Sequence, residues 1–269
     1  MIQSVQAYDT AAAIAALRID GVVILREAVD LKHIEVLRDQ MFADLPRVLA
    51  RTDLPCNFNH DNVQQSPSRE RKFLFRDVLL NDHVIAVTSA MLPGVTNTFY
   101  SGNTALPGTR RQPVHGDSGH LWLDTVVPAH AIVVNVPLVD MSDINGVTEL
   151  WPGSHLIPYT SAGKDIKVDP IFLERQRTLR PPEQPDVPAG SIILRDQRLW
   201  HAGMPNLSNT PRPMIAMIHN AGWFPAWEKP EFLVDTRDFF DHPILTTGAT
   251  WVESVDHTTL DHAYEFSQT

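Results

Sequence analysis

The sequence predicts one α+β domain, 1–269, whose β-rich part closes into a sandwich or barrel. Helical spacing of apolar residues is concentrated at the N-terminus, in a region that we place at about residues 9–50. Beyond residue 95, short apolar runs alternate with proline and glycine clusters, which is typical of many short strands. No linker or repeat marks a second domain. We therefore expect a β core at about 95–220 and a C-terminal extension at about 221–269.

The chain is expected to begin with a helix and a short strand. An alanine-rich stretch at residues 11–17 follows Asp9 and Thr10, and either side chain can cap a helix N-terminus. Gly21 then precedes four consecutive apolar residues, 22–25. Such a run, bounded by glycine, predicts a short buried strand.

A second helix is expected from Asp30 to Leu45, because apolar residues return there at helical spacing. Pro46 is expected to end it. From Asp53 to Ser68 the apolar periodicity disappears, and Asn, Asp, Gln and Pro accumulate. This composition predicts a long surface loop. Because long loops in compact domains are often functional, we expect it to act as a lid that orders when substrate binds.

The β-rich part contains its clearest apolar runs at residues 131–139, 191–194 and 214–218. We see no helix-length pattern among them. Four prolines between residues 181 and 188 read as a connection that ends at Gly190, where the next strand begins.

Charge and cysteine content exclude several classes of protein. Lys and Arg number 22 against 32 Asp and Glu, a formal charge of −10, which disfavours nucleic acid as a partner. The single cysteine, Cys56, fits a reducing compartment. No stretch of 18 apolar residues and no secretory signal are visible, so we expect a cytoplasmic protein without a membrane partner.

One local basic run departs from the acidic average. It contains Arg69, Arg71, Lys72 and Arg76. Such a run is either a solvated face or a contact for an anionic tail of a substrate. The oligomeric state is not determined by the sequence, and a homodimer is one option.

The first candidate site residues are His115 and Asp117, which form an H-x-D triplet. Twelve histidines and 22 aspartates predict about one such triplet by chance, so its neighbours decide its meaning. In a strand, residues i and i+2 share a face, and the pair could present a nitrogen and an oxygen to one metal ion. His201, at the end of the apolar run through Trp200, is the best candidate for a third ligand.

Arg212 is expected to bring a cation to the same place. It lies eleven positions beyond His201, and turn-forming residues separate the two. If the chain folds back near Asn206 and Leu207, His201 and Arg212 stand opposite each other in an antiparallel pair. Two histidines and one carboxylate leave three positions open on Fe(II), enough for a chelating keto acid and O2. Arg212 could then bind the second carboxylate of 2-oxoglutarate.

Three ordered motifs carry a resemblance to a known family. They are HGD from His115, NGVTELWPGSH from Asn145 to His155, and HAGMPNLSNTPR from His201 to Arg212. In these motifs the chain resembles the phytanoyl-CoA dioxygenase family of Fe(II)/2-oxoglutarate-dependent oxygenases, over roughly residues 15 to 220. The resemblance implies a double-stranded β-helix, a jelly-roll or cupin-like barrel, flanked by the N-terminal helices.

The resemblance also implies roles for particular residues. His115, Asp117 and His201 become the iron ligands, and Arg212 binds the cosubstrate. Thr148 and Asn135 match positions that often lie near that cosubstrate. Because halogenating relatives replace the carboxylate ligand, Asp117 favours hydroxylation or another oxidative outcome.

The expected activity is therefore oxidation, most simply hydroxylation, of a small organic molecule, with release of succinate and CO2. Secondary metabolism is one setting for it. Aromatic residues are candidates for an apolar substrate pocket: Phe75, Phe99, Trp122, Trp200 and Trp223. Two alternatives stay open, a catalytically silent relative that acts as a binding or heterodimer partner, and a β-barrel enzyme that uses another metal for hydrolysis or isomerisation.

Overall fold

The computed structural model describes residues 1–122, 124–158, 166–225 and 229–263. The last six residues of the expected C-terminal extension lie outside this part. The helices are α1 (Thr10–Asp20), α2 (Leu31–Leu49), α3 (Arg76–Leu79), α4 (Asp82–Met91) and α5 (Pro170–Leu179). The strands are β1 (Ser4–Gln6), β2 (Val22–Arg26), β3 (Cys56–Asn57), β4 (Asn59–Gln64), β5 (Thr96–Ala105), β6 (Ala131–Pro137), β7 (Glu149–Leu150), β8 (Ile192–Asp196), β9 (His201–Ala202), β10 (Arg212–Asn220), β11 (Glu231–Leu233), β12 (Thr246–Thr247) and β13 (Thr250–Val252).

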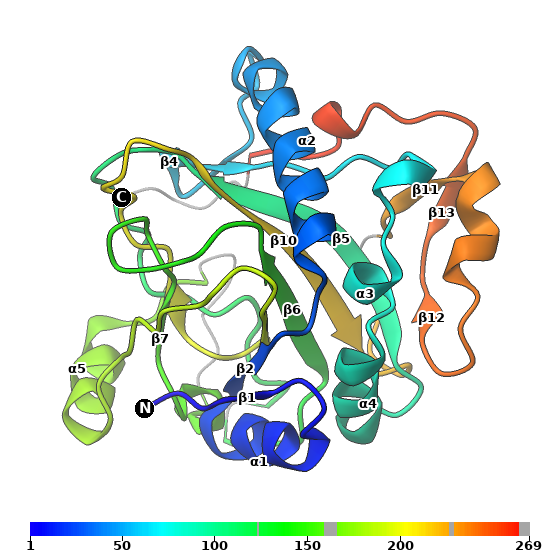
Figure 1. Cartoon of the computed structure of the whole chain (residues 1–269). Coiled ribbons are helices and arrows are strands. Elements are labelled where there is room, and N and C mark those ends of the chain that lie inside the picture. The colour runs from blue at the N-terminus through cyan, green and yellow to red at the C-terminus, as the bar shows by residue number, and fades with distance from the viewer. Residues whose placement is uncertain (123, 159–165, 226–228, 264–269) are drawn as a thin grey trace.

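These elements form a mixed α/β structure around one nine-stranded sheet (Figure 1). Its order is β1-β2-β8-β6-β10-β5-β4-β3, and β12 pairs with β5. The strand β10 lies between β5 and β6 and is antiparallel to both. A second, short sheet joins β7 and β9. The β-rich region beyond residue 95 is thus confirmed, and the strands at 131–137, 192–196 and 212–220 match its clearest apolar runs.

The two faces of the large sheet have different surroundings. One face packs on the helices α1 to α4 through a core that includes Leu17, Leu37, Val134, Leu194 and Met217. In β6, β8 and β10, the residues that alternate with Val134, Leu194 and Met217 point to the opposite face, because successive side chains of a strand point to opposite faces. Among those, Asn135, Arg195 and Met214 line a pocket. The helices therefore stabilise the sheet from one side, whereas the other side packs on a second apolar core at Ile24 and Ile193 and lines the pocket beyond it.

The N-terminal elements follow the predicted order, with one difference at the end of α2. Asp9 caps α1, since its carboxylate accepts a hydrogen bond from the backbone N–H of Ala12 (3.1 Å). The expectation that Pro46 ends the second helix is wrong, because α2 continues to Leu49. The proline removes one backbone donor, but Val48 is fully buried in the next turn and the backbone N–H of Ala50 bonds to the Pro46 carbonyl (3.1 Å).

The prediction of a surface loop at residues 53–68 is also wrong. This segment forms β3 and β4, and β4 pairs with β5 at the edge of the large sheet. Val63 points into the protein interior, whereas Asn62 and Gln64 on the other face line the pocket. One face of β4 points into the cavity and carries polar residues. The sequence of this strand therefore shows no apolar periodicity. This segment was expected to act as a mobile lid. Because β4 is paired with β5, the structure does not support that expectation.

A further difference is α5, which lies within the region where no helix was expected. Asp169 caps it by accepting a hydrogen bond from the N–H of Ile171 (2.9 Å), and Pro170 occupies its first turn. Of its residues only Gln176 is buried. A helix this exposed carries little apolar periodicity, which explains why the sequence pattern missed it.

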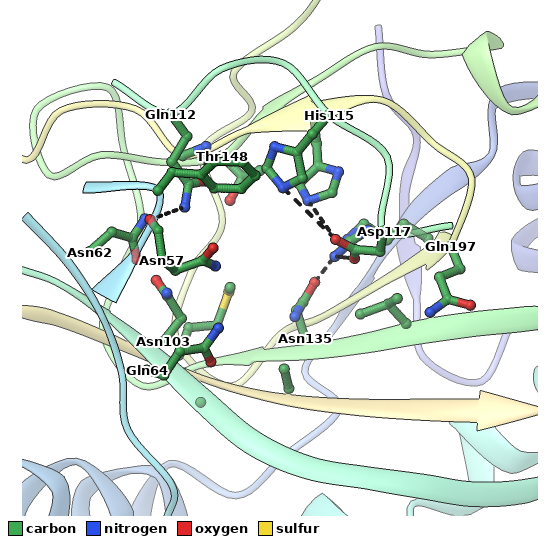
Figure 2. Close-up of a pocket in the computed structure, with 18 of the residues that line it drawn as sticks. Asn57, Asn62, Gln64, Asn103, Gln112, His115, Asp117, Asn135, Thr148 and Gln197 are labelled. Carbon is green, nitrogen blue, oxygen red and sulfur yellow. Dashed lines mark hydrogen bonds and ion pairs between the residues drawn. The ribbon is translucent and has the colours of Figure 1, made fainter. Parts of the chain in front are cut away.

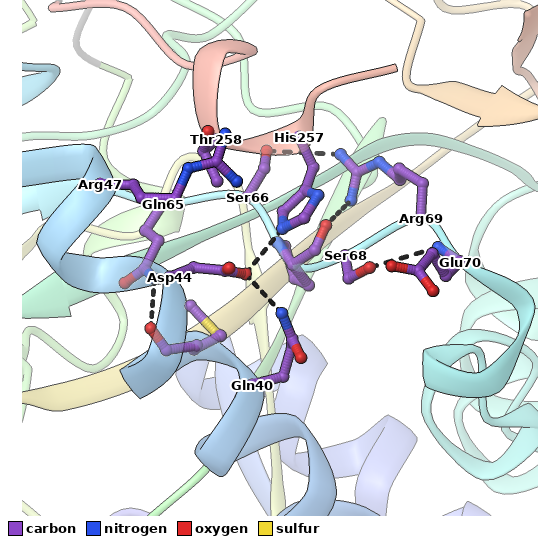
Figure 3. A network of polar contacts seen from close by, with 12 residues as sticks. Gln40, Asp44, Arg47, Gln65, Ser66, Ser68, Arg69, Glu70, His257 and Thr258 are labelled. Carbon is purple, nitrogen blue, oxygen red and sulfur yellow. Dashed lines mark hydrogen bonds and ion pairs between the residues drawn. The ribbon is translucent and has the colours of Figure 1, made fainter. Parts of the chain in front are cut away.

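The C-terminal extension packs beside the N-terminal helices (Figure 1). Buried Arg69 donates to the carbonyls of Glu231, Pro67 and Tyr100, and His257 contacts Asp44 of α2 at 2.7 Å (Figure 3). The remaining basic residues of the run at 69–76 are on the surface, and the run does not line the pocket. Both interpretations of this run are therefore incomplete, since Arg69 is a buried structural cation. Within the described residues, no helix combines the length and the apolar character needed to cross a bilayer.

One buried histidine gives the fold a dependence on pH. His219 of β10 contacts the Thr88 hydroxyl of α4 at 3.0 Å, and burial lowers its pKa to about 4. In the unfolded chain this imidazole takes up a proton near pH 6.5, whereas the folded chain resists it until about pH 4. Its contribution to stability is thus present above pH 6.5 and is lost as the pH falls toward 4.

Because of this histidine, we expect the free energy of unfolding to be about 2 kcal/mol lower at pH 5 than at pH 7.5. The variant His219→Gln keeps a polar group beside Thr88 but does not titrate in this range. Urea unfolding at both pH values should therefore show a smaller loss for His219→Gln than for the wild type. Equal losses would mean that other groups set the acid sensitivity.

Candidate functional site

A cavity of about 240 Å³ lies between the inner face of the large sheet and the short sheet of β7 and β9. Its walls include all four residues on which the predicted site depends: His115, Asp117, His201 and Arg212. Figure 2 shows His115 and Asp117 directed toward each other across one end of this pocket. Sequence positions almost 100 residues apart thus meet in a single cavity.

The His115, His201 and Asp117 side chains converge on one point. Each offers one ligand atom, and these three atoms all lie within 4.8 Å of one another. Asp117 Oδ1 is 3.8 Å from His115 Nε2 and 3.5 Å from His201 Nε2. His115 reaches this point through a two-way backbone bridge with His201, with N–O distances of 3.0 and 2.9 Å. Asp117 itself lies outside any strand, so only His115 has the strand pairing that was expected for the H-x-D triplet.

Both imidazoles are held in a form that can bind a metal. His115 Nδ1 lies 2.9 Å from the carbonyl of Pro113, and His201 Nδ1 lies 3.0 Å from that of Leu199. Since a carbonyl only accepts, Nδ1 carries the proton and each Nε2 keeps its lone pair facing Asp117. Burial lowers the pKa of both histidines, so they are neutral at neutral pH. Two neutral imidazoles and a carboxylate form the donor set that suits Fe(II) with open positions.

Arg195, which supports this triad, was not predicted from the sequence. Its Nη2 donates to Asp117 Oδ2 at 2.5 Å, and its Nε donates to Asn135 Oδ1 at 3.3 Å. Burial alone would raise the pKa of Asp117, but the Arg195 guanidinium beside it holds that pKa well below its usual range. Arg195 therefore keeps the carboxylate ionised and binds the oxygen that faces away from the histidines. An arginine that directly follows the apolar run Ile192–Leu194 in one strand is the signal that could have identified it.

We expect Arg195→Met to weaken metal binding about 10–100-fold, the usual effect of removing a group that orients a ligand. Titration with Mn(II), followed by electron paramagnetic resonance, measures this without requiring turnover. The variant Arg195→Lys should recover only part of the affinity, because a single ammonium group lacks the fork that joins Asp117 and Asn135. Wild-type affinity in Arg195→Met would show that Asp117 needs no support.

Arg212 fits an anion in the same cavity. It is 2% exposed, and its Nη2 donates to the carbonyl of Gly146 (3.0 Å). Its Nε and Nη1 are buried and have no hydrogen-bond partner among the residues that the structure describes. Burial lowers its pKa to about 10, so it stays charged at neutral pH. A buried cation with unused donors is what a carboxylate of a keto acid would require.

The predicted pairing of Arg212 with His201 is wrong. Arg212 begins β10 and lies opposite Ala105 of β5, whereas His201 belongs to β9 and pairs with Leu150. The connection through Asn206 carries the chain from the short sheet to the large one instead of forming a hairpin. Both side chains still reach the cavity, because the two sheets face each other across it.

Thr148 and Asn135 also line the cavity, on opposite sheets, and Phe99 is the one predicted aromatic that does. Phe75 stacks on His33 with ring centres 4.1 Å apart, in the helical layer. The other three aromatic candidates do not line the cavity either: Trp200 is buried near Trp151, and Trp122 and Trp223 are 56% and 60% exposed. Their expected place in a substrate pocket is therefore corrected. Aromatic character alone does not indicate which side of a sheet or loop a residue occupies.

Comparison with solved structures identifies proteins of the same fold. AviO1 from Streptomyces viridochromogenes Tue57 matches with a TM-score of 0.60 and 21% identity, over 81% of this chain and 97% of that one. EvdMO1 matches with a TM-score of 0.59 and 20% identity, over 79% of this chain and 50% of that one. The non-haem α-ketoglutarate-dependent carbocyclase SnoK from nogalamycin biosynthesis matches with a TM-score of 0.60 and 15% identity, over 81% and 86%. At these identities the likeness concerns the fold.

The family assignment depends on the sequence itself. The family model described as phytanoyl-CoA dioxygenase (PhyH) matches residues 17–214, which include the triad of His115, Asp117 and His201 as well as Arg195 and Arg212. The match covers well over half of the chain and agrees with the three motifs around His115, Asn145 and His201. The chain therefore belongs to the phytanoyl-CoA dioxygenase family.

Proposed function

We propose that the protein is an Fe(II)/2-oxoglutarate-dependent dioxygenase that hydroxylates a small organic molecule. One observation carries the proposal: His115, Asp117 and His201 converge on one point in a cavity that also contains the half-paired cation Arg212. Membership of the family supports the general class, an oxygenase dependent on iron and 2-oxoglutarate. The retained carboxylate of Asp117 favours hydroxylation.

The two sheets support a double-stranded β-helix as the architecture. In such a barrel the metal ligands and the cosubstrate arginine come from strands that face each other. Here His201 comes from the short sheet and Arg212 from the large one, with the cavity between them. Backbone bridges extend the short sheet on both sides, from Lys167 through His115 and from Leu150 to Glu183.

Different residues of the chain would bind the metal, bind the cosubstrate or hold the metal ligands in place. His115, Asp117 and His201 would hold Fe(II), and Arg212, with Thr148 beside the cavity, would hold 2-oxoglutarate. When both are bound, they supply the activation of O2, with succinate and CO2 as products. Arg195 keeps the Asp117 carboxylate ionised and fixed, and the carbonyls of Pro113 and Leu199 fix the two imidazoles. His115, His201 and Arg212 are buried, and of the four residues only Asp117 keeps a partly exposed side chain (28%).

The substrate is expected to belong to a biosynthetic route. SnoK, which shares the fold, is a carbocyclase of nogalamycin biosynthesis. A cavity of about 240 Å³ suits a small molecule or part of one. We propose that the protein is a cytoplasmic enzyme that acts on such a molecule.

The proposal is tested by measuring metal content and substrate-independent consumption of 2-oxoglutarate on one preparation. We expect one Fe(II) per chain and slow, iron-dependent formation of succinate, as this class shows even without its substrate. A preparation that binds Fe(II) and 2-oxoglutarate but never forms succinate would favour the silent binding partner. Hydrolysis or isomerisation with another metal, unaffected by 2-oxoglutarate, would favour the remaining alternative.

A further inference from the structure

Four amide side chains form one wall of the cavity: Asn57 of β3, Asn62 and Gln64 of β4, and Asn103 of β5 (Figure 2). We call these four the amide wall. The charged residues that line the cavity, Asp117, Arg195 and Arg212, come from other segments of the chain. The cavity therefore has a neutral polar wall that begins beside Arg212, since Arg212 and Asn62 both pair with Ala105 of β5.

The amide wall has unused hydrogen-bonding groups. Asn57 Oδ1, Asn62 Oδ1 and Asn103 Nδ2 are buried and have no partner within the described residues. Asn62 is only 6% exposed, so water reaches it poorly. A buried polar group without a partner costs about 1–3 kcal/mol, and buried polar groups are normally paired. Three such groups in one wall indicate a ligand that supplies their partners.

The backbone beside the amide wall is held by another amide, Gln112, which is hydrogen-bonded at both its oxygen and its nitrogen. Gln112 Oε1 accepts a hydrogen bond from the N–H of Gly203 (2.8 Å), and its Nε2 donates to the carbonyl of Asn57 (3.2 Å). A Cβ at Gly203 would lie 2.6 Å from Gln112 Oε1 and 2.9 Å from Asn62 Nδ2. A glycine is therefore needed for these amides to approach β9. The wall is a built feature and not a set of loose surface side chains.

An aromatic ring completes this side of the cavity. Phe58 is the single residue between β3 and β4, with a φ of +67°. A non-glycine residue at such a φ is strained by about 1–3 kcal/mol and persists where the surroundings demand it. Here the strained turn places the ring against His115, with ring centres 4.4 Å apart, and in the wall of the cavity. Phe99 adds a second ring from β5.

From this arrangement we infer that the amide wall binds a neutral, hydroxyl-rich part of the substrate, such as a glycosyl or polyol group. An amide offers both a donor and an acceptor, and so does a hydroxyl group, so neighbouring hydroxyls can satisfy both ends of one side chain. Neutral amides select against a charged group, whose desolvation they would not offset. The rings of Phe58 and Phe99 suit the C–H face of a sugar ring. This inference depends on the proposed function, because it assigns the substrate side of the same site.

The test uses protein loaded with Zn(II) and 2-oxoglutarate, which binds ligands without turnover. Saturation-transfer NMR is used to measure binding of a panel of phenyl glycosides and inositols, together with their O-permethylated counterparts and charged analogues. We expect at least one hydroxylated probe to bind, with its permethylated counterpart at least about tenfold weaker. Asn62→Leu and Asn103→Leu, which keep side-chain size, should each weaken that probe about tenfold. Asn103, which is only partly buried, serves if Asn62→Leu fails to fold.

The matched control is Asn209→Leu, the same exchange at an exposed position outside the cavity, which should bind the probe like the wild type. The inference is overturned if no hydroxylated probe binds, if methylation or the two wall variants make no difference, or if a charged analogue binds best. Substrate-independent formation of succinate by the iron-loaded wild type reports separately on the proposed function. Succinate without binding of hydroxylated probes would reject the amide-wall inference alone.

Discussion

Replacing His115 or His201 by alanine is expected to abolish turnover and to remove the tightly bound metal. Each change deletes one of three ligand atoms that lie within 4.8 Å of one another. The loss should exceed the roughly 10–100-fold that removal of a supporting residue costs. Metal content after gel filtration and formation of succinate are the two measurements. Wild-type iron content together with full activity in either variant would contradict the assignment of the site.

The same change at Asp117 should have a second effect, on stability. Asp117→Ala leaves Arg195 buried, with Asn135 as its remaining side-chain partner. A buried charge that loses its counterion is destabilising, and we expect the unfolding free energy to fall by about 1–3 kcal/mol. The histidine variants leave no such charge. Thermal unfolding of the three metal-free proteins should therefore place Asp117→Ala below the other two.

Changing Arg212 should act on the cosubstrate and leave the metal in place. A charge-assisted pair with a carboxylate is worth about 1.5–3 kcal/mol, so Arg212→Lys should raise the KM for 2-oxoglutarate roughly tenfold or more. Arg212→Met removes the charge as well and should raise it about 100-fold. Iron content should match the wild type in both. An unchanged KM would show that the anion binds elsewhere.

Stability separates this effect from damage to the fold. Within the described residues, Nε and Nη1 of Arg212 have no hydrogen-bond partner, so this buried cation does not stabilise the fold by itself. Its replacement by an apolar side chain of similar length is expected to leave the melting temperature unchanged or to raise it. Arg38→Met, on the exposed side of α2, is the matched control and should affect neither KM nor iron content.

Much of the site could be predicted because its residues lie in short motifs with fixed spacing. His115, Asp117, His201 and Arg212 were each identified from the sequence, and the structure places all four in one cavity. The strands beyond residue 95 were visible because their helix-facing residues are apolar. The path of the chain was harder to predict, since the spacing of His201 and Arg212 fits both a hairpin and a crossing between two sheets.

The polar residues of the site that could not be predicted share a physical cause. Asn62, Gln64 and Arg195 are polar residues on strands, and they point into a cavity. Hydrophobic periodicity identifies strands by contrast between an apolar face and a solvated face. A strand with one face on a polar pocket lacks that contrast, so β4 was taken for a loop and Arg195 was overlooked. Exposed Trp122 and Trp223 illustrate the converse, since a large apolar side chain does not have to be inside.

The position of β10 also has a consequence for how the chain folds. This strand fills the space between β5 and β6, although it is made more than 70 residues after either of them is complete. Until residues 212–220 leave the ribosome, the facing edges of β5 and β6 have unpaired backbone groups. Pairings this distant in sequence close large loops and make folding slow. The nascent chain is therefore most prone to aggregation just before its central strand is made, and a chaperone that covers strand edges would act at that stage.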